Sequence, residues 1–219
     1  MNIVCVGDCG VDRYVPLEVD RPGGITLNVA VHLRQCLPDA SVTVCSPLGS
    51  DAGANIVTNA IAQARLEARI RHLPGETPIQ YIDLEPNGEK RFIEYKPGVL
   101  RDYRLGAAES IIVRASDLLV TTVFAQVEAL FDSVMAIPSS GLRAVDFTNL
   151  SDVADGVGLV SQYVDRLDVA FFGLTSDEVS LIARLEEIAR SSGRLFVVTL
   201  GHDGSMALGG ARRMWMTQR

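Results

Sequence analysis

Two acidic residues directly follow the first apolar stretch and have the chemistry to bind a polyhydroxylated ligand. The string GDCGVDRY places Asp8 and Asp12 just after residues 2–7, which predict a buried strand. A carboxylate at such a position can accept hydrogen bonds from two adjacent sugar hydroxyls. The alternative is a turn or a cap, because aspartate commonly serves both. The residues alone leave the two interpretations open.

A second candidate is the string RPGGITLNVAVHL, which contains Gly23, Gly24 and Asn28. Adjacent glycines let the backbone approach a ligand closely. The helix expected at 26–37 points free amides and a partial positive charge at the same spot. Asn28, in its first turn, offers a donor and acceptors. The alternative is a simple Gly-Gly turn with Asn28 facing solvent.

A third candidate is the string VVTLGHDGSMALGG, residues 197–210. An apolar strand enters a loop that holds Gly201 and Gly204, and the chain then leaves as another short strand. Such glycine-containing loops often lie against a phosphate group, because the backbone can approach it closely.

Composition limits the classes of function. A chain of 219 residues fits one sizeable domain, and its 47% hydrophobic and 21% charged residues are ordinary for an α/β protein. The net charge of −7 argues against a broad nucleic-acid surface. No apolar run is long enough to span a membrane, and the first residues lack a basic signal region. We therefore expect a cytoplasmic protein whose four cysteines are free thiols, since none is in a CxxC pair.

The elements that must position these residues alternate between strands and helices. Besides 26–37, helices are expected at 53–64, with Asp51 as the N-cap, and at 176–192. The expected strands are short and apolar, and they cover 2–7, 41–49, 117–123, 143–148, 168–173 and 194–201. Buried strands separated by helices predict a parallel sheet with right-handed crossovers.

Two extended insertions interrupt this alternation. Residues 77–98 alternate around Asn87-Gly88, a pair that favours a tight hairpin turn, and residues 12–24 are also extended. We expect one small β-sheet above the carboxyl ends of the core strands, where α/β proteins bind ligands. This assigns 13–23 and 76–99 to a lid. The α/β core then comprises 1–12, 24–75 and 100–219. The exposed lid face, rich in Ile and Tyr, predicts pairing with a second copy.

Several of these strings, in this order, resemble motifs of the ribokinase-like (PfkB) sugar kinases. GGITLNVAVHL is similar to the first signature, and GDCGVDRY is similar to the first strand with its substrate-binding aspartate, at Asp12. The next landmark of the family is similar to PLGSDAGANI. The lid hairpin is similar to NGEKRF followed by EYKPG, and the nucleotide-side loop is similar to TLGHDGS. The match covers essentially the whole chain. GDCGVDRY and EYKPGV look closest to the fructosamine or fructoselysine kinase branch.

The resemblance implies a ribokinase-like three-layer α/β core, with a mostly parallel sheet and a small β lid. It implies ATP-dependent phosphorylation of a hydroxyl on a sugar or fructosamine-like substrate, with Mg²⁺. The substrate contacts are assigned to Asp8, Asp12, Gly23, Gly24 and Asn28. The nucleotide contacts are assigned to Thr199, Gly201 and Gly204.

The sequence departs from the family pattern in two places. The family's Asn-x-x-Glu motif aligns with TSDE, so Glu178 matches the magnesium-linked acid while Thr175 replaces the amide. The alternative is that this segment caps a helix. No string like DTTGAGDAF, which carries the family's anion hole and catalytic Asp, occurs before Arg219. No residue is therefore assigned a catalytic role, and the resemblance implies that residues 1–219 alone transfer no phosphoryl group at a useful rate.

Two other classes remain open. The first is a non-catalytic sugar-binding protein, either a truncated kinase or a pseudokinase. The second is a dinucleotide-binding oxidoreductase, although GDCGVD lacks the GxGxxG pattern and no helix follows it directly.

Overall fold

The computed structural model describes residues 1–86, 88–150, 153, 155–209 and 214–216. The chain divides into two compact units. The first comprises residues 1–119 and 126–141, and the second comprises residues 120–125 and 142–219.

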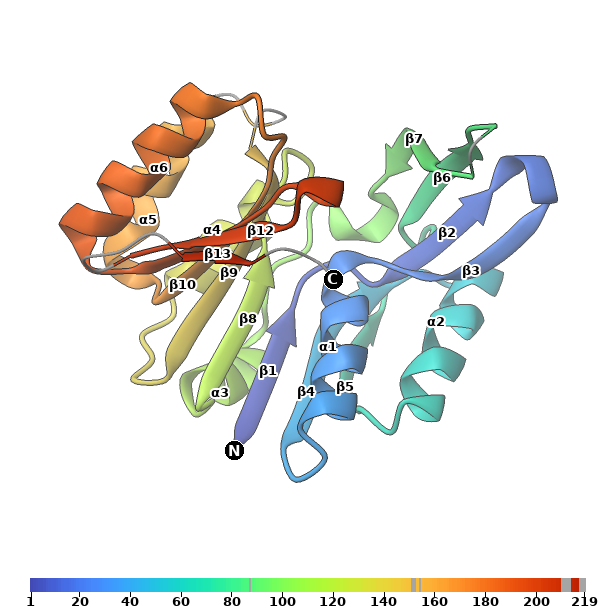
Figure 1. The fold of residues 1–219 in the computed structure, drawn as a ribbon. Helices are drawn as coiled ribbons and strands as arrows, with labels where there is room; N and C mark the ends of the chain where they lie inside the picture. Colours follow the sequence, from blue (N-terminus) through green and yellow to red (C-terminus); the bar gives the residue numbers. More distant parts are fainter. Residues whose placement is uncertain (87, 151–152, 154, 210–213, 217–219) are drawn as a thin grey trace. The chain divides into compact units, whose positions relative to one another are not determined.

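The first unit contains strands in the order β8-β1-β4-β5, in which β4 pairs in parallel with both β1 and β5. These strands are β1 (Asn2–Val6), β4 (Ser41–Leu48), β5 (Glu67–His72) and β8 (Leu118–Thr122), the last of which continues into the second unit. Helices α1 (Ile25–Cys36) and α2 (Ala52–Gln63) are the connections before and after β4. Figure 1 shows both helices in blue and cyan beside these strands.

The two central strands, β1 and β4, form the core of this unit. Every residue of each strand after the first is buried, and Ile3, Cys5 and Val44 have no exposed surface. Strands covered on both faces lose all contact with water, so only near-continuous apolar sequences are stable there. Strand β5, by contrast, lies at the sheet edge and is mostly exposed. Its sequence EARIRH therefore lacks the apolar run on which the strand predictions depended.

The predicted small sheet is confirmed, with the strand order β3-β2-β6-β7. Its strands are β2 (Gly10–Tyr14), β3 (Val19–Gly23), β6 (Ile79–Leu84) and β7 (Lys90–Lys96). The parallel pairing of β2 with β6 joins the two insertions. Gly88 has φ +86°, as a tight hairpin requires, while Asn87 lies outside the described residues. The exact lid boundaries, 13–23 and 76–99, stay a prediction.

The remaining elements of the first unit are short. They are the helices α3 (Ala107–Arg114) and α4 (Glu128–Met135) and the 3₁₀ turns η1 (Val15–Leu17) and η2 (Gly98–Leu100). All four cysteines are free thiols, as expected: Cys5, Cys9 and Cys45 are buried, and Cys36 is exposed.

The second unit contains strands in the order β13-β12-β11-β10-β9. Strands β9 (Leu142–Asn149), β10 (Val169–Gly173) and β11 (Leu195–Thr199) pair in parallel, whereas β12 (Ser205–Leu208) and β13 (Met214–Met216) pair antiparallel. Its helices are α5 (Gly156–Tyr163), α6 (Val179–Ser192) and the 3₁₀ turns η4 (Val164–Arg166) and η5 (Gly201–Asp203).

Three phenylalanines, one from each parallel strand, form the core of the second unit. The ring centroids of Phe147 and Phe172 are 5.3 Å apart, and those of Phe172 and Phe196 are 5.2 Å apart. Helix α6 begins at Val179 rather than at the predicted residue 176. Within the described residues, the structure contains no helix of the length and apolar character needed to cross a bilayer.

Candidate functional site

The carboxylate of Asp8 caps helix α1. Its Oδ2 accepts a hydrogen bond from the Ile25 amide at 2.9 Å, and its Oδ1 accepts from the amide and hydroxyl of Thr26, both at 3.2 Å. Gly24, the N-cap residue, has no side chain that could do this. Gly24 also has φ +101°, and a Cβ there would lie 2.5 Å from the Asp8 carbonyl oxygen. Glycine is therefore required at this position, and the loop after β1 is fixed to the helix.

Burial dominates the electrostatics of Asp8, whose exposed fraction is 4%. Removal from water raises the pKa of Asp8 to about 6, although the hydrogen bonds from Ile25 and Thr26 oppose the rise. The capping alternative therefore describes what both oxygens do in this structure. A direct contact between Asp8 and substrate stays a prediction.

Asp12 lies in a different environment, although only four positions separate it from Asp8. Its side chain is half-buried on β2 and forms no hydrogen bond with any residue that the structure describes. A Cβ at Gly23 would lie 2.1 Å from Asp12 Oδ1, so the absence of a side chain at Gly23 makes room for the carboxylate. Burial raises the pKa of Asp12, and the charge of Lys90 opposes that rise. No described residue donates a hydrogen bond to either carboxylate oxygen.

Asn28 lies one turn into α1 and is exposed. Its amide N–H donates to the Gly24 carbonyl oxygen at 3.0 Å, and its side chain forms no hydrogen bond within the described part of the chain. The structure thus links the predicted substrate residues through one segment, Gly23-Gly24, which Asp8 and Asp12 both contact.

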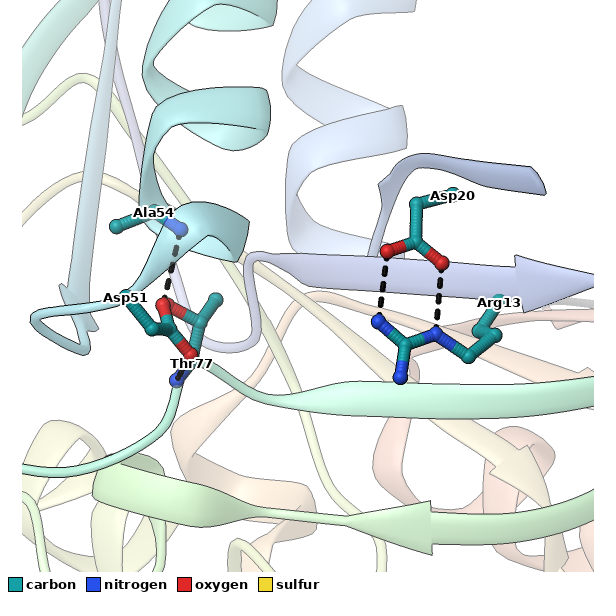
Figure 2. Close-up of polar contacts among 5 residues, drawn as sticks. All are labelled: Arg13, Asp20, Asp51, Ala54 and Thr77. Atoms are coloured by element: carbon teal, nitrogen blue, oxygen red, sulfur yellow. Dashed lines mark hydrogen bonds and ion pairs between the residues drawn. The ribbon is translucent and has the colours of Figure 1, made fainter. Parts of the chain in front are cut away.

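A part-buried hydrogen-bond network that the sequence did not reveal anchors the small sheet (Figure 2). Asp51 caps α2 as predicted, because its Oδ1 accepts from the Ala54 amide at 3.1 Å. The same carboxylate accepts from Thr77, at 2.6 Å from the hydroxyl and 2.9 Å from the amide. Although burial alone acts to raise it, the hydrogen bonds from Thr77 and Ala54 hold the pKa of Asp51 below its ordinary value.

Thr77 and the residue after it also connect this network to β2, the strand that carries Asp12. The Thr77 hydroxyl accepts a hydrogen bond from the Gly49 amide at 3.0 Å, which ties the end of β4 to the start of β6. The carbonyl of the next residue, Pro78, accepts from the Val11 amide at 2.8 Å. Thr77 is therefore a positioning residue for the first half of β2. Nothing in the local sequence signals this role.

The glycine loop of the second unit has the backbone that its composition predicted. Gly201 has φ +57° and Gly204 has φ +95°, and the Leu200 amide donates to the Gly204 carbonyl oxygen at 2.8 Å. A Cβ at Gly201 would meet no atom within 4 Å, so this position faces open space. The exposed Thr199 uses its hydroxyl to donate to the Phe172 carbonyl oxygen at 3.2 Å.

Glu178 forms the turn that precedes α6. Its Oε2 accepts from the Thr175 amide at 2.8 Å and from the Thr175 hydroxyl at 3.0 Å. This turn explains why the helix starts after Glu178. Within the described residues, no group of three His, Cys, Asp or Glu side chains could hold a metal ion. The magnesium-linked role of Glu178 stays a prediction.

Two characterised kinases are similar to almost the whole chain, whereas no protein-family model matches it. Fructoselysine 6-kinase of Escherichia coli (strain K12) is 26% identical over 215 residues, which cover 96% of this chain and 78% of that protein. Fructosamine kinase FrlD of Bacillus subtilis (strain 168) is 29% identical over 220 residues, 97% of this chain and 73% of that protein.

A solved structure gives the fold. Ribokinase from Giardia lamblia superposes with a TM-score of 0.77 at 15% identity, covering 100% of this chain and 76% of that one. The chain has the ribokinase-like fold. The similarity to these two kinases supports an ATP-dependent carbohydrate kinase, and the predicted α/β class with a mostly parallel sheet is confirmed. Neither the dinucleotide oxidoreductase nor the non-catalytic alternative is favoured.

Proposed function

We propose that the sugar substrate bound by this chain is a fructosamine, a sugar joined to an amine, and that Asp12 binds its hydroxyls. The observation that carries the proposal is the Asp12 carboxylate, which is half-buried and has no hydrogen-bond partner in the described structure. A ligand hydroxyl supplies the donors that this carboxylate lacks, at about 1.5–3 kcal/mol for each hydrogen bond to a charged group. The similarity to fructoselysine and fructosamine kinases supports the substrate class.

The neighbouring residues complete this substrate side. Gly23 makes room for the Asp12 carboxylate, Gly24 permits the turn into α1, and the exposed side-chain amide of Asn28 donates to or accepts from a further hydroxyl. Asp8 holds the N-terminus of α1 in place beside them.

The nucleotide side belongs to the second unit. Thr199, Gly201 and Gly204 contact the phosphates of ATP, and the open space at Gly201 supports this assignment. Glu178 carries a carboxylate of the type that Mg²⁺ prefers, reached through water. Bound Mg²⁺ offsets the negative charge of the transferred group. The use of ATP supports a cytoplasmic location.

The outer strand of the small sheet supports pairing with a second copy. Strand β7 lies at the sheet edge and exposes Phe92 (68%) and Ile93 (52%). Ile82 is fully buried, so Phe92 and Ile93 provide the apolar surface for this pairing. Light scattering at micromolar concentration gives a dimer mass if this pairing forms and a monomer mass if it does not.

Calorimetry on the wild-type chain tests the proposed function. We expect fructoselysine to bind more tightly than free fructose or ribose. ATP should raise the thermal midpoint, and a nicotinamide dinucleotide should leave it unchanged. The proposal fails if none of the three sugars binds, or if the dinucleotide stabilises the protein and ATP does not.

A further inference from the structure

The face of the small sheet that carries Asp12 also carries an aromatic ring and an ammonium group. Asp12 and Tyr14 are two positions apart on β2, so their side chains lie on the same face, about 7 Å apart along the strand. Lys90 reaches this face from β7, with its Nζ 5.2 Å from the centroid of the Tyr14 ring. Its charge also acts on Asp12, whose pKa it lowers against the effect of burial.

Lys90 differs from the arginines of the same sheet. Arg13 forms an ion pair with Asp20, and Arg91 pairs with Asp83 and Glu85. The exposed Lys90 forms no ion pair with a described residue. An ammonium group held over an aromatic ring and in no ion pair with a described residue is suited to bind an anion, while the ring offers surface to an alkyl chain.

We propose that Tyr14 and Lys90 form a subsite for the amino-acid part of the substrate, in which Lys90 binds its carboxylate. This inference rests on the proposed fructosamine substrate. In a sugar joined to the side-chain amine of lysine, a methylene chain separates the sugar from the carboxylate. The sugar then lies at Asp12, the methylene chain packs on the Tyr14 ring, and the carboxylate meets the Lys90 ammonium.

The charges favour a carboxylate over a phosphorylated sugar. A phosphate group carries close to two negative charges near neutral pH, and the half-buried Asp12 carboxylate on the same face would repel it. A carboxylate carries one negative charge, which a single ammonium can balance.

The test compares fructoselysine with its α-carboxamide, which lacks the negative charge, by calorimetry on the full chain. Wild-type protein should bind the acid about three- to tenfold more tightly than the amide, the range for one partly exposed charged contact. Lys90→Gln should abolish this preference, and Lys90→Arg should retain it. Lys96→Gln is the matched control, because Lys96 also lies over a tyrosine ring, 5.0 Å from Tyr81, and that ring is on the opposite face.

Three results would overturn the inference. Equal affinity of the wild type for acid and amide removes the subsite while leaving the proposed function intact. Loss of the preference in Arg21→Gln but not in Lys90→Gln assigns it to Arg21, an exposed cation opposite Asp12 on β3. Failure of the wild type to bind either ligand removes the proposed function and the subsite together.

Discussion

Asp8 and Asp12 are the same residue type, four positions apart, and the protein uses them in opposite ways. Asp8 is fully buried and directs both carboxylate oxygens to the backbone and hydroxyl of α1. Asp12 is half-buried, and no described residue donates a hydrogen bond to it. The difference places Asp8 in the scaffold and leaves Asp12 as the carboxylate that we propose for ligand binding.

The two adjacent glycines match this division. Gly24 is required by its positive φ and by the nearby Asp8 carbonyl oxygen, whereas Gly23 makes room for the Asp12 side chain. A side chain at Gly24 would strain the backbone, whereas a side chain at Gly23 would only displace the end of the Asp12 side chain. Substitutions at the two glycines should therefore distinguish loss of stability from loss of ligand binding.

The largest effect is expected from alanine at these glycines. Gly24→Ala should lower the free energy of unfolding by about 2–4 kcal/mol, because it forces a positive φ and a backbone clash. Gly23→Ala should cost less stability but displace the Asp12 carboxylate and weaken fructoselysine binding. Urea unfolding and calorimetry on both variants check this. Equal unfolding free energies for Gly24→Ala and Gly23→Ala would contradict the different roles assigned to the two glycines.

The pH dependence of stability should report on Asp8. Its folded pKa of about 6 lies above its ordinary value of 3.8, so its contribution to stability is fully present below pH 3.8 and is lost as pH rises through 6. The loss amounts to roughly 3 kcal/mol. Urea unfolding from pH 4 to 7 should show the wild type losing stability relative to Asp8→Asn. If the free energies of unfolding of wild type and Asp8→Asn depend on pH in the same way, burial does not raise the pKa of Asp8.

Loss of the Thr77 hydroxyl should have an intermediate effect. Thr77→Val removes its hydrogen bonds with Asp51 and Gly49 in a buried site, at about 1–3 kcal/mol of unfolding free energy. Fructoselysine binding should weaken as β2 loosens, while ATP binding stays unchanged. Thr77→Ser keeps the hydroxyl and should restore both properties. Unchanged sugar affinity in a folded Thr77→Val protein would limit Thr77 to a structural role.

The smallest effect is expected from the Arg13–Asp20 ion pair, which Figure 2 shows beside the Asp51–Thr77 hydrogen bonds. Asp20 accepts two hydrogen bonds from Arg13, both at 2.7 Å, but the pair is partly exposed. Asp20→Asn should lower the free energy of unfolding by about 0.2–1 kcal/mol. A larger loss of unfolding free energy would show that Asp20, like Asp8 and Asp51, contributes substantially to stability.

Local patterns in the sequence predicted most of the fold. Apolar runs located β1 and β4, the alternating segments located the small sheet, and Asp51 was identified as a cap because it adjoins its helix. The edge strand β5 was missed because exposure replaces its apolar residues with charged ones.

The candidate site was harder to predict because its key contacts join distant residues. Asp8 caps a helix 17 positions away, and Asp51 binds Thr77 across 26 positions. No local pattern encodes either contact. The sequence grouped Asp8 with Asp12 as substrate ligands, since two aspartates of one string look alike until their surroundings are known.

The most direct test of this account is a titration of fructoselysine into wild-type protein, Asp12→Ala and the matched Asp20→Asn variant, with unfolding curves for all three. We expect Asp12→Ala to weaken binding at least ~100-fold, because two charged hydrogen bonds are lost. Its unfolding free energy should remain within about 1 kcal/mol of wild type. Asp20→Asn should bind normally. Wild-type affinity in a folded Asp12→Ala protein would contradict the account.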